Sequence, residues 1–236
     1  MWIGGNMAKT AIVTGANRGI GLEIVQQLLG QGLNVIATAR NPENADQLLS
    51  LAKDYKELLT VSPLDVSKPE SVKDFGASLG DTPIDFLFNN AGILVNHSDV
   101  PPSIDIDAIQ ESFNINTLGP IRVYQACRDN LLNAESPKHI LTTSKMGSLS
   151  DNTSGRAYAY RMSKAAVNMF IRSLSKDDDK VVSVAMHPGW VQTDMGGPNA
   201  LITTAKSASG MIDFAMKAKS SDSGQFFSYD AQSIPW

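Results

Sequence analysis

The 236-residue chain contains a single cysteine, Cys127, and therefore cannot form an intrachain disulfide. It also has little excess charge of either sign, since its formal net charge is only −4. Proteins that bind nucleic acid usually carry a basic face, so nucleic acid is not an expected partner. A lone thiol is typical of a reducing compartment, and we expect a cytoplasmic protein. On its helical segment, Cys127 is expected to be a small buried apolar residue rather than a nucleophile.

Long hydrophobic runs are absent as well. No stretch reaches the roughly 18 apolar residues that a membrane-spanning helix needs, so we expect no membrane partner. The first residues lack a charged segment followed by an apolar one, which excludes a secretory signal there. We interpret residues 1–8 as an extension, either added during expression or produced by an upstream start, and residues 9–236 as one domain. The three histidines, His97, His139 and His187, lack metal-ligand spacing, and no metal site is expected.

Apolar runs and helical patterns alternate along residues 9–236 and predict an α/β fold. Continuous apolar runs are typical of parallel strands that are buried on both faces. We therefore predict a doubly wound parallel sheet (Rossmann fold) with helices on both faces. The predicted strands are Thr10–Thr14, Asn34–Thr38, Leu59–Leu64, Ile84–Phe88, Lys138–Thr143, Val181–Met186 and Gln225–Tyr229. The predicted helices are Ile20–Leu29, Glu43–Lys53, one opened by a capping box at Ser67–Glu70 and ending near Leu79, Ile106–Asn133, Tyr158–Ser175 and Thr204–Lys217.

A glycine-rich loop lies between the first predicted strand and the first predicted helix. Its sequence is Thr14-Gly-Ala-Asn-Arg-Gly-Ile-Gly21, with glycines at the turn and at the start of the helix. Such glycines let a pyrophosphate approach the backbone, while the helix N-terminus offers N–H groups and partial positive charge to the anion. The spacing G-x-x-x-G-x-G differs from the usual G-x-G-x-x-G, so the loop alone also fits a tight turn without ligand.

The end of the second strand indicates which nucleotide is bound. Enzymes that use NAD place a carboxylate there, against the ribose 2′-hydroxyl. This strand instead ends in Ala39-Arg40, and the glycine loop contributes Arg18. Both cations could pair with a 2′-phosphate through charge-assisted hydrogen bonds, although each could also be an ordinary surface charge. We therefore predict NADP rather than NAD as the cofactor.

The candidate catalytic pair is Tyr160 and Lys164, four residues apart on one face of a predicted helix. A free phenol has a pKa of about 10, which is too high for efficient acid–base chemistry near neutrality, and a nearby cation favours the phenolate. The Y-x-x-x-K spacing alone is weak, since it also describes a surface Tyr–Lys pair. Ser144 ends the fifth strand, at the edge where parallel sheets bind ligands.

Taken together, these motifs resemble the short-chain dehydrogenase/reductase family over nearly all of residues 9–236. The resemblance rests on the glycine loop, Asn89-Asn-Ala-Gly92, Asn116-Thr-Leu-Gly119, Ser144 before Tyr160–Lys164, and Pro188-Gly189. The segments 159–164, 187–200 and 227–236 look like the branch that contains bacterial C-factor and the sniffer-type carbonyl reductases. Two departures concern substrate shape: the loop Ser148–Arg156 is expanded, and the connection Lys176–Lys180 is short.

The resemblance implies a set of residue roles. Tyr160 is the general acid in reduction and the base in oxidation, and Lys164 lowers the pKa of Tyr160 and holds the nicotinamide ribose. Ser144 binds the substrate carbonyl, and Asn116 positions a water that leads protons toward Lys164. Asp65 contacts adenine, Asn90 and Gly92 the adenosine ribose region, and Thr193 the carboxamide. The full cofactor set is Gly15, Asn17, Arg18, Gly19, Ile20, Gly21, Arg40, Asp65, Val66, Asn90, Ala91, Gly92, Tyr160, Lys164, Pro188, Gly189, Val191 and Thr193.

The sequence thus predicts an NADP(H)-dependent reductase of ketones or aldehydes. Substrate specificity is expected from the segments Leu94–Pro102, Ser148–Ala157 and Trp190–Ala205, of which Thr193–Ala205 is a candidate lid. The family resemblance also implies a homodimer or homotetramer. Two alternatives stay open: a regulatory dinucleotide-binding protein, similar to C-factor, with little turnover, and the opposite direction, alcohol oxidation.

Overall fold

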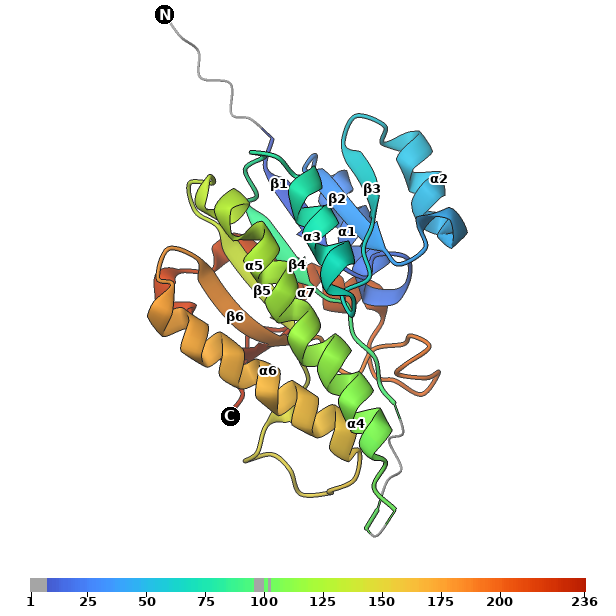
Figure 1. Ribbon diagram of the computed structural model, residues 1–236, viewed down its shortest axis with the longest axis vertical. Coiled ribbons are helices and arrows are strands. Elements are labelled where there is room, and N and C mark those ends of the chain that lie inside the picture. Colours follow the sequence, from blue (N-terminus) through green and yellow to red (C-terminus); the bar gives the residue numbers. More distant parts are fainter. Residues whose placement is uncertain (1–7, 96–99, 102) are drawn as a thin grey trace, which may run out of the picture.

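The computed structural model describes residues 8–95, 100–101 and 103–236 (Figure 1). Within these residues, one seven-stranded parallel sheet has the order β3-β2-β1-β4-β5-β6-β7. The strands are β1 Thr10–Val13, β2 Asn34–Ala39, β3 Leu59–Pro63, β4 Phe86–Asn89, β5 Lys138–Thr142, β6 Val182–His187 and β7 Phe226–Ser228. The predicted doubly wound parallel sheet is therefore confirmed.

Helices cover both faces of the sheet. They are α1 Gly19–Gly30, α2 Asp46–Asp54, α3 Pro69–Ser78, α4 Ile106–Phe113, α5 Gly119–Leu132, α6 Tyr158–Asp177 and α7 Thr204–Lys217. Helices α3, α5 and α6 lie over the near face in Figure 1, and α1 packs against α7 on the other. One apolar core joins Leu28 of α1 and Met211 of α7 to the sheet, and a second contains Phe75 of α3 and Val123 of α5. None of the described helices is long and apolar enough to cross a membrane.

The predicted capping box at Ser67–Glu70 is wrong. Helix α3 begins at Pro69, its N-cap is Lys68, and no side chain caps it. The Ser67 hydroxyl instead donates to Asp65 Oδ1 over 2.6 Å. Proline fits the first helical position because its fixed φ is already helical and it has no N–H to satisfy. The hydroxyl of Ser67 is therefore bonded within the turn that precedes α3 and does not cap the helix.

Two other predicted helices differ in detail. The helix predicted over Glu43–Lys53 is a 3₁₀ turn at Pro42–Asn44 followed by α2, because Ala45 has a non-helical backbone (φ −100°, ψ 62°). The long helix predicted over Ile106–Asn133 is continuous, but Asn114–Leu118 forms a π-helical turn between α4 and α5. Such turns are frequent at functional sites, and this one contains Asn116.

The strand order reverses between β1 and β4, where connections leave toward opposite halves of the sheet. Open parallel sheets bind ligands in the crevice at such a point, beyond the carboxyl ends of the strands. The glycine loop follows β1 and Asn90 follows β4, so the topology brings both to this crevice. Residues 1–7 of the predicted extension, His97 and the middle of the segment 94–102 lie outside the described residues.

Candidate active site

A cleft of about 920 Å³ lies along the carboxyl edge of the sheet. It is lined by most of the residues that the sequence assigned to cofactor binding: Gly15, Asn17, Arg18, Gly19, Ile20, Arg40, Asp65, Val66, Asn90, Ala91, Gly92, Tyr160, Lys164, Pro188 and Thr193. Other assigned residues lie close by without lining it: Gly21, Asn116, Ser144, Gly189 and Val191. A second cavity of about 390 Å³ beside α7 contains none of the predicted site residues.

The glycine loop has a shape that only glycine permits. Gly15 and Gly19 have left-handed φ values of +64° and +57°, which side chains rarely adopt. A Cβ atom on Gly21 would overlap the carbonyl oxygen of Gly15. Helix α1 has no side-chain cap and no acidic residue in its first turn. The loop and the helix N-terminus thus fit a pyrophosphate, whose charge the helix dipole favours.

Thr14 and Asn90 join the glycine loop to the end of β4. The Thr14 hydroxyl oxygen accepts from the backbone N–H groups of Asn90, over 2.9 Å, and Ala91, over 3.0 Å. The Asn90 side-chain amide donates to the Thr14 carbonyl over 3.0 Å. Asn90, which the sequence placed at the ribose, therefore also holds the loop on which the cofactor would lie.

Arg18, Arg40 and Asp65 line the end of the cleft beside β2 and β3, which we call its outer end. Arg40 follows β2, is exposed and forms no ion pair within the part of the chain that the structure describes, whereas Arg18 pairs with Asp194. Burial raises the pKa of Asp65, but hydrogen bonds from Ser67 and the charges of Lys68 and Arg40 hold that pKa below its usual value. Asp65 is therefore an anion that accepts hydrogen bonds, as an adenine amino group would offer.

Tyr160 and Ser144 meet at the inner end of the cleft. Ser144 follows β5 and Tyr160 lies in the first turn of α6, so that the Ser144 side chain is close enough to act on the phenol. Burial raises the pKa of Tyr160 to about 12, and the Ser144 hydroxyl opposes that shift. The phenol is thus protonated near neutral pH and can serve as a proton donor, although only 9% of the residue is exposed.

Lys164 lies one helical turn beyond Tyr160 on α6. Its ammonium donates to the Thr142 carbonyl over 3.0 Å and lies 5.7 Å from the centre of the Tyr160 ring. Burial lowers the pKa of Lys164 to about 8. The family resemblance implied that Lys164 lowers the pKa of Tyr160, but in this structure burial dominates and that pKa is raised. Desolvation disfavours both charged forms, which explains the opposite direction.

Asn116 occupies the π-helical turn and is fully buried. Its side-chain oxygen accepts from Ile93 N over 2.8 Å, and its amide donates to Ile93 O over 2.9 Å and Ser163 Oγ over 3.1 Å. A Cβ atom on Gly92 would stand 3.1 Å from Asn116 Oδ1 and 3.5 Å from Lys164 Nζ. Asn116 therefore fixes the chain after β4 beside Lys164, and its side-chain hydrogen bonds are used within the protein.

The comparisons with known proteins agree with this arrangement. Residues 9–201 match the family described as short chain dehydrogenase. The chain belongs to the short-chain dehydrogenase family. It is 41% identical to C-signal of Myxococcus xanthus over 167 residues, which cover 70% of this chain and all of that protein.

Two solved structures are similar to this short-chain dehydrogenase over its whole length. The carbonyl reductase Sniffer of D. melanogaster has a TM-score of 0.91 and 31% identity, with 98% of this chain and all of that one covered. A carbonyl reductase from Pseudomonas aeruginosa PAO1 in complex with NADP has a TM-score of 0.87 and 30% identity, with 97% of this chain and all of that one covered. The predicted family and its C-factor and sniffer branch are thus confirmed.

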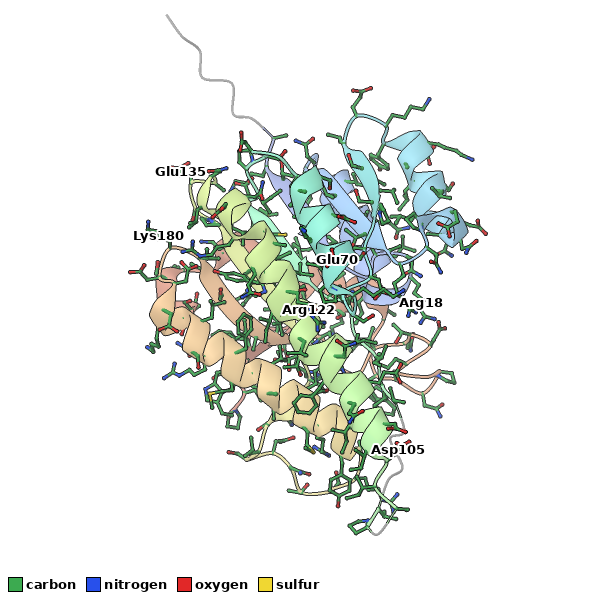
Figure 2. All side chains as sticks on the ribbon, in the orientation of Figure 1. Arg18, Glu70, Asp105, Arg122, Glu135 and Lys180 are labelled. Carbon is green, nitrogen blue, oxygen red and sulfur yellow. The ribbon has the colours of Figure 1, made fainter. Side chains whose placement is uncertain are left out.

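Three residues at the site were not singled out from the sequence of this short-chain dehydrogenase. Asp194 pairs with Arg18, Arg122 of α5 donates to Val66 O over 3.2 Å and to Asn114 Oδ1 over 2.9 Å, and Arg161 follows Tyr160. Arg18 and Arg122 can be located in Figure 2. The Arg18–Asp194 and Arg122–Val66 contacts join segments far apart in the chain, and no local pattern marks them.

Cys127 and His187 lie where the sequence predicted them. Cys127 lies on the buried face of α5, and burial raises the pKa of its thiol to about 12. His187 ends β6, as predicted, and burial followed by the charge of Lys145 lowers its pKa to about 4. Among the described residues, no group of three or more His, Cys, Asp or Glu side chains could hold a metal ion.

Proposed function

We propose that this short-chain dehydrogenase is an NADP(H)-dependent reductase that converts a ketone or aldehyde to an alcohol, with Tyr160 as the general acid. The observation that carries the proposal is the content of one cleft. Its inner end holds the phenol of Tyr160 beside Ser144 and Lys164, and its outer end holds Arg18 and Arg40. The proton-donating groups and the glycine loop lie along the same carboxyl edge of the sheet. Hydride transfer to a carbonyl needs both a bound dinucleotide and a proton donor in one cleft.

The chain's own residues supply the proton and the orientation. A nicotinamide dinucleotide supplies the hydride when it is bound. Tyr160 would donate its phenolic proton to the carbonyl oxygen, and the Ser144 hydroxyl would donate a hydrogen bond to the same oxygen. The ammonium of Lys164, 5.7 Å from the Tyr160 ring, would stabilise the phenolate that remains. Burial of Tyr160 keeps water away from the acid, which strengthens these interactions.

NADP is the cofactor that these residues fit better. Strand β2 ends in Ala39 and Arg40, so no carboxylate stands there to bind both ribose hydroxyls. Arg40 is exposed in the cleft, and Arg18 lies at the same end of it. The structural relative from P. aeruginosa was solved in complex with NADP, which supports the same choice. NAD stays the less favoured cofactor.

The substrate is proposed to be an apolar carbonyl compound. Ile93, Ile115 and Met195 contribute apolar surface to the cleft, and Trp190 and Leu201 are exposed in the segment after β6. The similarity to carbonyl reductase Sniffer points to the same class. A homodimer or homotetramer of single-domain subunits, located in the cytoplasm, stays a prediction of the sequence.

A second candidate function follows from the similarity to C-signal. In that case the chain would bind a dinucleotide to regulate a signal, with little turnover. The presence of Tyr160 and Lys164 in the cleft, with Ser144 beside Tyr160, favours catalysis, because a purely regulatory protein has no need of a proton donor there. The direction of alcohol oxidation uses the same groups with Tyr160 as the base.

A screen of NADPH oxidation over aldehydes, ketones and quinones tests the proposal. We expect turnover with at least one apolar carbonyl compound and at least about 10²-fold slower turnover in the Tyr160→Phe variant. NADPH binding, measured by fluorescence, should be retained in both proteins. Tight NADPH binding without turnover on any carbonyl would favour the regulatory function, and turnover only with alcohols and NADP⁺ would favour the opposite direction.

A further inference from the structure

Three side chains of α6 hold the turn that carries Ser144. Arg161 Nη1 donates to Met146 O over 3.2 Å, Lys164 Nζ to Thr142 O over 3.0 Å, and Asn168 Nδ2 to Gly147 O over 3.3 Å. Gly147 packs on the helix backbone so closely that a Cβ atom there would lie 2.8 Å from the carbonyl carbon of Lys164. The position of Ser144 relative to Tyr160 is therefore set by how this turn is attached to α6.

Arg161 also holds the segment that leads into α6. Its Nε donates to Gly155 O over 3.0 Å and Arg156 O over 3.2 Å, and its Nη2 donates to Ser154 Oγ over 2.9 Å. Three consecutive residues here have left-handed φ values: Gly155 +63°, Arg156 +59° and Ala157 +47°. Non-glycine residues persist in this conformation only where the surrounding structure holds them.

We propose that Arg161 is a positioning residue, which fixes the Ser144 turn and the segment 154–157 relative to Tyr160. Arg161 alone among the three α6 side chains contacts both segments. These segments flank Tyr160 from both sides, because one carries Ser144 and the other leads directly into the helix. The planar guanidinium offers donors in several fixed directions, which the point charge of a lysine does not reproduce.

This inference rests on the proposed function, since it assigns to Arg161 an effect on the Ser144–Tyr160 pair. It needs no direct contact between Arg161 and substrate. Removing the guanidinium leaves the carbonyls of Met146, Gly155 and Arg156 without their donor, so both segments gain freedom. Near-attack geometry is sensitive to such shifts, because a misplacement of about 1 Å can lower the rate of an enzyme by about 10²-fold.

The first experiment measures how firmly Arg161 holds the Ser144 turn and the segment 154–157, and it does not depend on turnover. Hydrogen exchange of residues 144–157 is compared between the wild type, Arg161→Ala, Arg161→Lys and the control Arg172→Ala. Arg172 lies on the same helix and donates to Gly224 O over 3.2 Å, away from the cleft. We expect faster exchange in Arg161→Ala, an intermediate rate in Arg161→Lys and no change in Arg172→Ala. Unchanged exchange in Arg161→Ala overturns the proposal.

The second experiment measures positioning with a carbonyl substrate that the wild type reduces. We expect kcat to fall roughly tenfold in Arg161→Ala, within the range for a small misplacement, while the Kd for NADPH stays within about twofold. Added guanidinium chloride at non-denaturing concentration should restore part of kcat in Arg161→Ala and none in Arg172→Ala. If Arg161→Ala does not fold, Arg161→Lys is expected to show the same split between kcat and Kd with a smaller loss.

The outcomes separate the two proposals. Faster exchange with an unchanged kcat would make Arg161 a structural clamp only and overturn its positioning role. A parallel loss of kcat and NADPH affinity would do the same, because it indicates general damage to the cleft. If the wild type reduces no carbonyl compound, the proposed function fails, and the exchange experiment still decides whether Arg161 holds the two segments.

Discussion

Arg18 and Asp194 form an ion pair across the mouth of the cleft, with Arg18 Nη1 2.6 Å from Asp194 Oδ2. Arg18 belongs to the glycine loop, and Asp194 to the segment that follows β6; Figure 2 shows Arg18 close to that segment. Beside this ion pair, Gly19 of the glycine loop packs closely on Thr193, because a Cβ atom on Gly19 would stand 3.3 Å from Thr193 Cγ2. The arginine that the sequence assigned to a 2′-phosphate is thus already engaged, and Asp194 would compete with that phosphate.

Asp194→Asn is therefore expected to raise the affinity for NADPH. Both side chains are largely exposed, at 69% and 78%, so the ion pair contributes little. A gain of about two- to fivefold in NADPH affinity fits that small energy, and NADH affinity should change less. Titrations of each cofactor followed by fluorescence give the four dissociation constants. Asp179→Asn removes one exposed negative charge elsewhere and serves as the control. An equal effect on both cofactors would mean that Arg18 does not bind the phosphate.

Arg40→Asp tests the other arginine at the same end of the cleft. The substitution removes a cation from the tip of β2 and places a carboxylate where NAD-binding enzymes have one. Hydrogen bonds to charged groups contribute about 1.5–3 kcal/mol, so NADPH should weaken by about 10- to 100-fold more than NADH. The control Lys180→Asp changes the charge equally at an exposed position that does not line the cleft and lies across the molecule from Arg18 (Figure 2). Wild-type protein that binds both cofactors equally would contradict the proposed preference for NADP.

Much of the fold could be predicted because its signals are local. The strand Ile84–Phe88 is a continuous apolar run, and the observed β4 overlaps it. The helix Thr204–Lys217 was predicted with the bounds that the structure has, and in the structure Thr203 caps it, with Lys206 N donating to the Thr203 hydroxyl. The π-helical turn Asn114–Leu118 could not be predicted, because it depends on long-range bonds from Asn116 to Ile93 O and from Arg122 to Val66 O.

In the candidate site, too, the features with local sequence signals could be predicted and those that depend on long-range contacts could not. Motif spacing was enough to bring Tyr160 and Lys164 to one face of α6 and the glycine loop to the sheet edge. It could not show that Arg161 holds two segments or that Asp194 reaches Arg18, 176 positions away in sequence. Nor could it show that burial, rather than the lysine charge, dominates the pKa of Tyr160. These properties arise only from packing.

Tyr160→Phe removes the transferable proton and keeps the ring in place. Loss of a general acid typically costs 10²–10⁴-fold, so carbonyl reduction should fall by at least about 10²-fold. NADPH binding should survive, since the pyrophosphate would lie on the glycine loop and the N-terminus of α1 rather than on the phenol. Single-turnover oxidation of bound NADPH measures the chemical step directly. Near-normal turnover in this variant would remove Tyr160 from the role of acid.

Acid sensitivity is expected from two buried histidines. Burial lowers the pKa of His139 to about 3, and burial with Lys145 lowers that of His187 to about 4. The unfolded chain binds protons near pH 6.5, so it binds more protons than the native state between about pH 4 and 6.5. The free energy of unfolding should therefore fall as the pH drops through that window, approaching about 1.4 kcal/mol per pH unit for each histidine.

His139→Gln isolates the contribution of the more deeply buried histidine. Glutamine retains an acceptor for Asn89 Nδ2, which lies 3.4 Å from His139 Nε2, but it does not titrate. Urea unfolding at pH 7, 6 and 5 gives the free energy of unfolding at each pH. Its slope against pH in this variant should be about half that of the wild type. The lowered pKa values of Asp65 and Asp178 act only at lower pH, because such carboxylates lose their stabilisation as the pH falls through their own range. The same slope in both proteins would show that His139 is not responsible.

The outer surface of α6 is expected to be a subunit interface. Met162 and Met169 lie seven positions apart on this helix and are both exposed, and Leu118 and Ile106 are exposed on the neighbouring π-helical turn and α4. Helix α4 packs against α6, so these apolar side chains belong to adjacent elements. Exposed apolar groups gathered on neighbouring helices are typical of a surface that a second subunit covers.

Met169→Glu tests that interface, because a buried, unpaired carboxylate would cost far more in a dimer than in a monomer. Met169 is 65% exposed in the single chain, so its substitution should leave the fold and NADPH binding intact. Sedimentation velocity at micromolar concentration should show a dimer or tetramer for the wild type and a smaller species for this variant. Leu201→Glu introduces the same charge at an exposed apolar residue of the segment after β6 and should leave the assembly unchanged. A monomeric wild type would contradict the predicted oligomer, and a variant that assembles normally would place the interface on another face.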